Sequence, residues 1–345
     1  MPWVVGRLDT PGGVVSEVNT VLNWSDRLGG WKARWGVNRM QYWVKPGLYA
    51  VGTPTSESPV FATANYKMSF DQLRSALHGI DGWILVLDTK GINVWCAAGK
   101  GTFGTDEIVR QVKATSLNSV VSHNRLVVPQ LGAPGVAAHE VRRQTNFRVV
   151  YGPVRAHDIP AFLRAQMKAT PQMRRVEFPL ADRLAVVPVE ILQSAKWALL
   201  IAAILFLLSG FGPDGYTWGA AFSVGLASAL LVISAYLLGT VLTPVLLPWL
   251  PGRPLALKGL WTGIGLCIVA GIGSWQLGSG WLSRLDAAAL TLIVLAIASF
   301  MAMKFTGSTT YTSLSGVRRE MRIAVPLQAL GSVLGIVLWI AGRFV

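Results

Sequence analysis

Apolar residues fall into two patterns along the chain. Up to about residue 190, short apolar runs alternate with segments of helical spacing, and charged residues are common. Beyond that point lie five apolar segments, each long enough for the about 20 residues that a membrane-spanning helix needs. They cover roughly 191–211, 217–238, 258–276, 286–304 and 323–342. The pattern predicts a soluble half followed by an all-α membrane domain of five transmembrane helices.

In the soluble half, strand signals alternate with helix signals. Apolar runs at 60–63, 83–87, 125–128 and 147–151 predict strands, and the spacing at 70–77, 105–115 and 136–145 predicts helices. Thr105 is a suitable N-cap, since Asp106 and Glu107 follow it in the first turn. The alternation predicts a Rossmann-like α/β domain with a parallel sheet, in which ligands lie beyond the carboxyl ends of the strands.

Glycine, proline and polar residues follow each predicted strand. They occupy 63–66, 88–96, 129–135 and 152–155. Any one of these segments alone is explained as a tight turn between a strand and a helix. Four of them at one sheet edge favour a large ligand, because small residues let backbone amides approach it closely.

Composition sharpens the division into two halves. Hydrophobic residues make up 52% of the chain, and Asp214, Asp286 and Glu320 are the only acidic residues beyond Glu190. We expect an N-terminal extension over 1–45 packed on the soluble domain, a ligand-binding α/β domain over 46–185 and a transmembrane domain over 186–345. The net charge of +14 is spread over both halves without a run of Lys and Arg, which argues against nucleic-acid binding.

Basic residues distinguish the two sides of the membrane. Arg253 and Lys258 follow the second predicted span, and Lys304 and a group of arginines follow the fourth. The positive-inside rule then places the soluble half in the cytoplasm and Val345 outside, in a multi-pass protein of the cytoplasmic (inner) membrane.

The two cysteines, Cys96 and Cys267, lie in different halves, so the chain alone builds neither a disulfide framework nor an iron–sulfur cluster. By spacing alone Cys96 is a small buried residue. Its neighbours favour another role: Asn93 is a suitable N-cap, which places Cys96 in the first turn of a short helix, where the helix dipole favours a thiolate. Lys100, one turn on, would support the thiolate or bind a phosphate. The four histidines show no zinc-site spacing, so a transition metal in this half would depend on Cys96.

Residues 99–104 match G-x-G-x-x-G and raise the alternative of a dinucleotide site. The glycines do not directly follow the strand that ends near Leu87, and no acidic residue follows Val127 and Val128 to hold a ribose. A Walker A motif is excluded, since Gly101 stands where Ser or Thr is required.

Several segments together resemble one known family. Residues 46–52, 63–67, 91–105, 129–135 and 151–155 look like the corrinoid-binding domain of the corrinoid iron–sulfur protein family. The cysteine-bearing segment 93–100, followed by about five spans and by 311–316, resembles the HgcA branch, whose members are membrane-anchored corrinoid proteins of mercury methylation. The acetyl-CoA-pathway members of the family lack this cysteine and carry a cluster-binding module that is absent here.

The resemblance implies a base-off cobamide at the sheet edge, with the Cys96 thiolate as lower axial ligand of its cobalt. A cap helix over 93–98 would present that thiolate, and no iron–sulfur cluster would lie in this chain. The implied cofactor contacts are Thr63, Asn65, Asn93, Val94, Trp95, Ala97, Ala98, Gly99, Lys100, Gly101, Gln130, Leu131, Gly132, Ala133, Gly152 and Pro153.

The implied activity is that of a corrinoid-dependent methyltransferase, which passes a cobalt-bound methyl group to Hg(II) and gives methylmercury. A donating thiolate suits this soft acceptor, which takes the methyl group with its bonding electrons or as a radical. The implied partners are a ferredoxin of the HgcB type as electron donor, a methyl-donating methyltransferase and the lipid bilayer. Two alternatives stay open: transfer to another acceptor, such as an acetyl-CoA-forming enzyme, and a membrane scaffold that binds a nucleotide.

Overall fold

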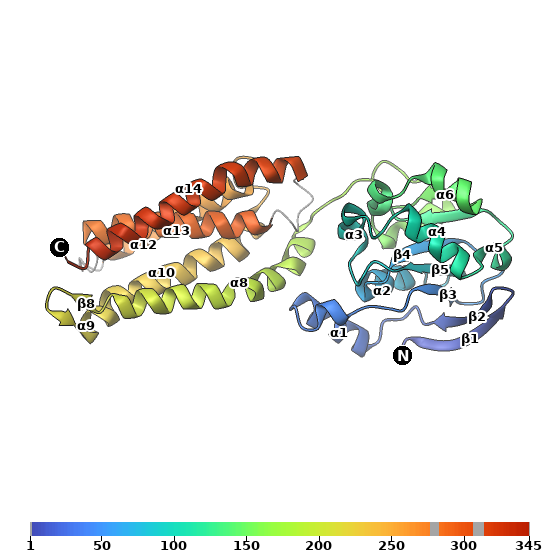
Figure 1. The fold of residues 1–345 in the computed structure, drawn as a ribbon, viewed down its shortest axis with the longest axis horizontal. Helices are drawn as coiled ribbons and strands as arrows, with labels where there is room; N and C mark the ends of the chain where they lie inside the picture. The colour runs from blue at the N-terminus through green and yellow to red at the C-terminus, as the bar shows by residue number, and fades with distance from the viewer. Residues whose placement is uncertain (1, 277–282, 306–313, 345) are drawn as a thin grey trace. The chain divides into compact units, whose positions relative to one another are not determined.

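A computed structural model describes residues 2–276, 283–305 and 314–344 and divides the chain into two compact units (Figure 1). Unit 1 is Met1–Val176, and unit 2 is Glu177–Val345. Residues 311–313 of the segment 311–316, which contributed to the family resemblance, lie outside the described residues.

Unit 1 is built on a seven-stranded sheet with the strand order β1-β2-β3-β5-β4-β6-β7. The strands are β1 (Val4–Thr10), β2 (Gly13–Val18), β3 (Gly47–Val51), β4 (Val60–Ala64), β5 (Gly82–Leu87), β6 (Arg125–Val128) and β7 (Arg148–Tyr151). Strands β5, β4, β6 and β7 run parallel to one another, as predicted. The sheet is mixed rather than fully parallel, because β3 pairs antiparallel with β5 and β1 forms an antiparallel hairpin with β2.

Helices cover both faces of this sheet. They are α1 (Trp24–Arg34), α2 (Lys67–Ala76), α3 (Val94–Lys100), α4 (Thr105–Ala114), α5 (Leu117–Val120), α6 (Ala138–Thr145) and α7 (Ile159–Arg164), with 3-10 turns η1 (Arg39–Gln41), η2 (Gln130–Gly135) and η3 (Ala156–Asp158). Side chains alternate across the sheet: Leu85 of β5 packs with α3 to α6, whereas Ile84 packs with α2 and α7. Burial on both faces explains why 83–87 is a continuous apolar run.

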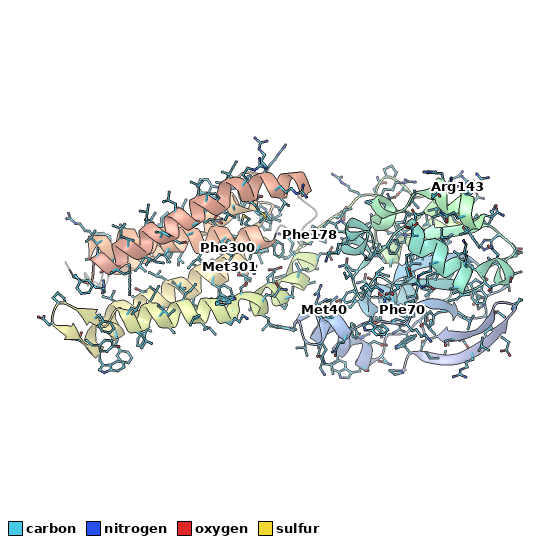
Figure 2. All side chains as sticks on the ribbon, viewed as in Figure 1. Met40, Phe70, Arg143, Phe178, Phe300 and Met301 are labelled. Carbon is cyan, nitrogen blue, oxygen red and sulfur yellow. The ribbon has the colours of Figure 1, made fainter. Side chains whose placement is uncertain are left out.

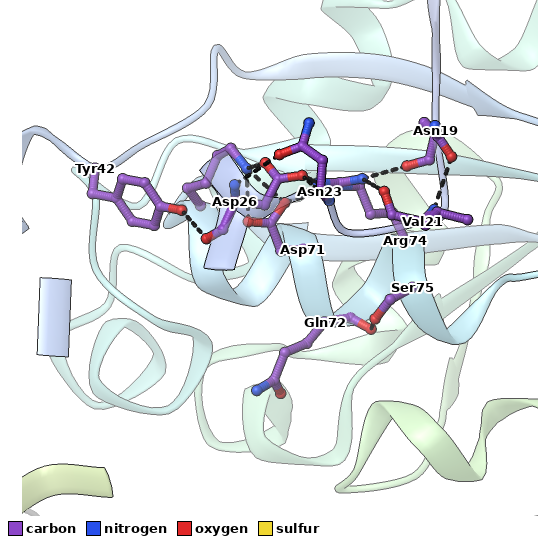
Figure 3. A network of polar contacts seen from close by, with 10 residues as sticks. Asn19, Val21, Asn23, Asp26, Tyr42, Asp71, Gln72, Arg74 and Ser75 are labelled. Carbon is purple, nitrogen blue, oxygen red and sulfur yellow. Dashed lines mark hydrogen bonds and ion pairs between the residues drawn. The ribbon is translucent and has the colours of Figure 1, made fainter. Parts of the chain in front are cut away.

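A buried ion network joins α1 to α2 (Figure 3). Lys67 Nζ lies 2.8 Å from Asp26 Oδ1 and 2.7 Å from Asp71 Oδ2, and Arg74 Nη2 lies 2.7 Å from Asp26 Oδ2. Burial raises the pKa of Asp26, but hydrogen bonds from Lys67 and Arg74 outweigh it, so that the pKa of Asp26 is lowered. The network therefore fixes which face of α1 is turned toward the domain.

Unit 2 contains five helices, among the described residues, that are long and apolar enough to cross a membrane. This finding is consistent with a membrane protein, and the predicted fold class is confirmed. The first long helix is α8 (Leu180–Leu208), and the short strands β8 (Phe211–Gly212) and β9 (Gly215–Tyr216) follow it. The second, Trp218–Leu246, consists of α9 (Trp218–Ala220), the π-helical turn η4 (Ala221–Gly225), α10 (Leu226–Leu237), the π-helical turn η5 (Leu238–Leu242) and α11 (Thr243–Leu246). The other three are α12 (Leu255–Gln276), α13 (Arg284–Lys304) and α14 (Leu314–Ala341).

The helix ends differ from the hydropathy boundaries. Helix α8 begins at Leu180, well before the predicted start at 191, and so contains Glu190, a buried carboxylate. Hydropathy marks the apolar part of such a helix, whereas backbone hydrogen bonds continue into its polar first turns. The expected N-cap Thr105 is also wrong: Gly104 holds that position, and the Thr105 hydroxyl accepts a hydrogen bond from the Ala137 amide at 2.8 Å.

Candidate functional site

The carboxyl ends of the four parallel strands meet at one edge of the sheet. Ala64 pairs with Leu87 at the ends of β4 and β5, and Val128 pairs with Tyr151 at the ends of β6 and β7. The segments that follow these strands are therefore neighbours, as the sequence predicted. This edge is where open α/β sheets bind their ligands.

A cavity of about 250 Å³ lies at this edge. It is lined by the ends of β4 and β6, the first turn of α3, one face of α2 and the segment after β7. Seven residues predicted as cofactor contacts lie in its wall: Thr63, Asn93, Val94, Trp95, Leu131, Gly152 and Pro153. Pockets for whole small molecules measure about 300–1,000 Å³, so this cavity suits one part of a large ligand.

Helix α3 carries Cys96 in its first turn. Asn93 is the N-cap, and its side-chain Oδ1 accepts a hydrogen bond from the Cys96 amide at 2.9 Å. The predicted N-cap is therefore confirmed. Cys96 is a free, partly exposed cysteine, and the three residues before it line the cavity. The buried side of the helix, with Ala97 and Ala98, packs into the core and leaves α3 in a fixed position beside the cavity.

Asn65 organises the loop that leads into α3. Its Oδ1 accepts hydrogen bonds from the backbone amides of Thr89 (3.1 Å) and Gly91 (2.9 Å), and its Nδ2 donates to Asp88 Oδ1. Burial raises the pKa of Asp88, but hydrogen bonds from Lys90 prevail, and the pKa of Asp88 is lowered. Asn65 thus holds the 88–92 loop from within the protein and is not part of the cavity wall.

A buried polar atom beside the wall fits a bound polar ligand. Gln130 stands between Pro129 and Leu131, which line the cavity, and its Oε1 is buried without a hydrogen-bond partner in the part of the chain that the structure describes. Such an atom is costly unless a ligand or water satisfies it. Gly152 also lines the cavity, and a Cβ there would come within 2.9 Å of Val127 Cγ1. Gly152 therefore leaves room for the Val127 side chain, and Gln130 places an acceptor without a partner among the described residues next to the wall.

The remaining predicted contacts lie outside the cavity wall. Gly99, Lys100 and Gly101 are exposed at the carboxyl end of α3. Gly132 is buried, since a Cβ there would meet Phe103 Cε1 at 2.4 Å, and Ala133 is half-buried in η2. Gly132 therefore leaves room for the ring of Phe103 to pack against the backbone.

The cavity also has lining residues that the sequence reasoning did not select. Helix α2 contributes Ser69, Gln72 and Leu73, and the segment after β7 contributes Val154, Ala156 and Ile159. The spacing of 69, 72 and 73 puts them on one helical face, which is a detectable signal. The sequence did not indicate that this face turns toward the strand ends rather than toward solvent.

The glycine motif at 99–104 does not form a dinucleotide-binding loop. Gly101 ends α3 in a left-handed conformation with φ of 79°, and Gly104 is the N-cap of α4. The motif thus joins two helices, whereas a dinucleotide fingerprint joins a strand to a helix. This arrangement weakens the alternative of a nucleotide-binding scaffold.

Comparison with known proteins relates this unit to others. Residues 38–163 match the sequence family described as CO dehydrogenase/acetyl-CoA synthase delta subunit. The acetyl-CoA decarbonylase/synthase complex subunit gamma of Archaeoglobus fulgidus is 33% identical over 122 residues, which are 35% of this chain and 26% of that subunit. The corrinoid/iron-sulfur protein large subunit of Moorella thermoacetica is 29% identical over 126 residues, which are 36% of this chain and 28% of that subunit.

The chain thus spans about a quarter of the length of these relatives. The matched residues include β3 to β7, the cavity wall and α3, but not the helices of unit 2. These similarities support a relationship between residues 38–163 and the corrinoid iron–sulfur protein family.

Proposed function

We propose that unit 1 binds a cobamide at the carboxyl edge of its sheet and that the protein is a corrinoid-dependent methyltransferase. The similarity to a corrinoid/iron-sulfur protein subunit supports the cofactor class. The buried Gln130 Oε1 supports a ligand at this edge, because it has no hydrogen-bond partner among the described residues and Gln130 stands between two residues of the cavity wall. The cavity would take the nucleotide tail, while the larger ring would lie over the strand ends and α3. When bound, the cobamide supplies a cobalt centre that carries the methyl group from donor to acceptor.

We propose that the Cys96 thiolate is the lower axial ligand of this cobalt. The observation that carries this assignment is the first turn of α3, where a partly exposed cysteine directly follows three residues of the cavity wall. Asn93 positions it, because its side chain holds the Cys96 amide and so fixes the start of the helix. Asn65 positions the preceding loop through the amides of Thr89 and Gly91.

The methyl acceptor that we propose is Hg(II), with methylmercury as the product. Hg(II) is a soft cation, and a strongly donating thiolate from Cys96 would favour transfer to such an acceptor. The relatives named as acetyl-CoA decarbonylase/synthase subunits support a second candidate, an acetyl-CoA-forming enzyme as acceptor. The two candidates differ in the product that an intact methylation system forms.

The proposed partners follow from what a methyl carrier needs. A ferredoxin of the HgcB type would return the cobalt to its reduced state, and a separate methyltransferase would supply the methyl group. The basic residues around Arg253, Lys258 and Lys304 support placing unit 1 on the cytoplasmic side and Val345 outside.

Substitution of the two cysteines tests the function. Cys96→Ala in the full chain should still bind cobamide, shift its visible absorption spectrum, and reduce methylmercury formation to background in cells that also carry the ferredoxin. Cys267→Ala is the matched control, since that thiol lies on α12 in unit 2, and it should change neither readout.

Three outcomes would count against the proposal. Unchanged methylmercury formation by Cys96→Ala would overturn the ligand assignment. A purified protein without cobalt, even after incubation with cobamide, would overturn the cofactor. Methyl transfer to an acetyl-CoA-forming enzyme without any methylmercury would establish the second candidate.

A further inference from the structure

One face of α1 is apolar and exposed to solvent. Trp24, Leu28 and Trp31 lie on it, and Trp35 continues it at the C-cap. Successive spacings of four, three and four residues put these side chains on a single stripe of a helix. The exposed fractions are 65% for Trp24, 52% for Trp31 and 49% for Trp35. Large aromatic residues are seldom left this exposed together without a binding partner.

The stripe is held outward by the opposite face of the helix. That face consists of Asp26, Gly30 and Ala33, all buried. Asp26 forms ion pairs with Lys67 and Arg74 of α2 (Figure 3), and the capping box with Asn23 fixes the first turn. The orientation of the stripe is therefore set by the fold of unit 1 and does not arise from a loosely attached helix.

Basic residues flank the stripe on both sides. By helical position Arg27 and Arg34 lie along one side of it and Lys32 along the other. The only acidic residue of α1 is Asp26, whose charge is turned inward and paired. The segment that follows adds the exposed apolar side chains Val37, Met40 and Trp43 and the basic Arg39. Figure 2 shows Met40 at the surface of this segment, in contrast to the fully buried Phe70.

We propose that α1 is an interfacial helix that inserts its tryptophan stripe into the headgroup region of an anionic bilayer. Trp and Leu on one face with flanking Lys and Arg are the features of helices that lie in the plane of a membrane. Tryptophan in particular prefers the level of the headgroups. Cationic flanks complement anionic lipid and not a neutral surface. The same chain carries five helices long and apolar enough to cross a membrane, the first beginning at Leu180. A bilayer that these helices cross would therefore be tethered to unit 1 through the chain.

Spin labelling of the full chain in lipid vesicles tests whether α1 inserts into the bilayer. The label is placed on Leu28→Cys, in a Cys96→Ser, Cys267→Ser background, and its collision rates with oxygen and with a water-soluble nickel chelate are compared. Val14→Cys is the matched control, because Val14 is 66% exposed on β2 of the same unit. In vesicles with a third of anionic lipid, the label at 28 should be reached by oxygen and shielded from the chelate, and the label at 14 should show the reverse.

Charge reversal separates lipid from protein as the occupant of this face. Each basic residue raises the affinity for an anionic surface about fivefold. The double substitution Arg27→Glu with Lys32→Glu should therefore make the label at position 28 accessible to the nickel chelate. Neutral lipid vesicles should have the same effect. A label at 28 that remains in water in anionic vesicles overturns the proposal. So does a label that is shielded equally in both lipids and after charge reversal, because a protein surface then covers the stripe.

Discussion

At the scale of single residues, the site depends on a few side chains that hold backbone rather than ligand. Asn93 is the clearest case, because its Oδ1 accepts from the Cys96 amide at the start of a helix only seven residues long. A short helix has little stability of its own, so its cap contributes a large share of it.

Asn93→Ala should therefore loosen α3. Loss of an N-cap costs about 1 kcal/mol, and we expect faster hydrogen exchange at the amides of 94–97 together with a weaker effect of Cys96 on the cobamide spectrum. Asn93→Asp retains an acceptor at the same position and serves as the control. Equal exchange rates in all three proteins would show that α3 is held by its buried side alone.

Gln130 is expected to lower the stability of the cobamide-free protein and to strengthen cobamide binding. Its buried Oε1 has no partner among the described residues, and such an atom costs about 1–3 kcal/mol. Gln130→Met should raise the free energy of unfolding of the cobamide-free protein by about 1 kcal/mol and weaken cobamide binding. Gln144→Met, at an exposed position, should do neither. A stabilised variant with unchanged affinity would remove Gln130 from the proposed site.

Local side-chain chemistry predicted one helix start correctly, at Asn93, and missed another by one residue, at Thr105. The N-cap Asn93 and the place of Cys96 in the first turn follow from side-chain chemistry within a few residues. Asn65 was expected at the ligand, yet the structure uses its amide to bind the loop at 89–91, more than 20 residues away in sequence. Contacts of that range depend on how strands pair, which no local pattern reports.

At the scale of elements, the α1–α2 ion network combines stability with orientation. Asp26 has a side chain that is only 3% exposed, and it faces two cations. A buried ion pair that loses one partner costs about 3–5 kcal/mol, because the remaining charges stay out of water.

Asp26→Asn should lower the free energy of unfolding of unit 1 by about 3 kcal/mol. Glu140→Gln is the control: its pair with Arg143 is exposed, and its loss should cost less than about 1 kcal/mol. Denaturant unfolding of the full chain in detergent, followed by circular dichroism, would measure both. Similar losses in the two variants would mean that the buried network adds nothing beyond a surface pair.

The same carboxylate should shape the acid stability of unit 1. The pKa of Asp26 in the folded protein lies below its ordinary value of 3.8, so its stabilising contribution is complete above pH 3.8. As the pH falls below 3.8, the unfolded chain takes up a proton that the folded chain does not, and stability declines until the folded carboxyl is protonated as well. Asp26→Asn should therefore show a shallower loss of stability with acid than the unsubstituted protein. If the free energy of unfolding fell equally steeply below pH 3.8 in the two proteins, the lowered pKa of Asp26 would be contradicted.

The elements themselves were largely predictable. Strands β4 to β7 follow from apolar runs, since burial on both faces leaves little choice of residue. The antiparallel β3 and the hairpin β1–β2 were not predicted as part of the sheet, because direction and partner are set by tertiary pairing rather than by composition. Helix α8 extends into polar sequence for a similar reason, as hydropathy records the environment of a helix and not its hydrogen bonds.

At the scale of the whole molecule, the chain consists of two units with separate cores. Unit 1 has a hydrophobic cluster on each face of its sheet, and unit 2 has clusters of its own among its long helices. Every residue of the candidate cavity wall lies before Val176. The division into two units was evident from hydropathy, while the cavity required the pairing of four distant strand ends.

Separate cores predict that unit 1 is independent in folding and in ligand binding. A fragment of residues 1–176 should unfold in a single cooperative transition and bind cobamide with the affinity of the full chain, because it contains both clusters and the complete cavity wall. The full chain in detergent should show an additional transition from unit 2. On the proposed function, the fragment in cells should still carry cobamide but methylate Hg(II) far less than the full chain, since it lacks the helices that would anchor it at a membrane. A folded fragment that has lost cobamide would show that unit 2 takes part in binding, and a fragment with full activity in cells would show that membrane attachment is dispensable for methyl transfer.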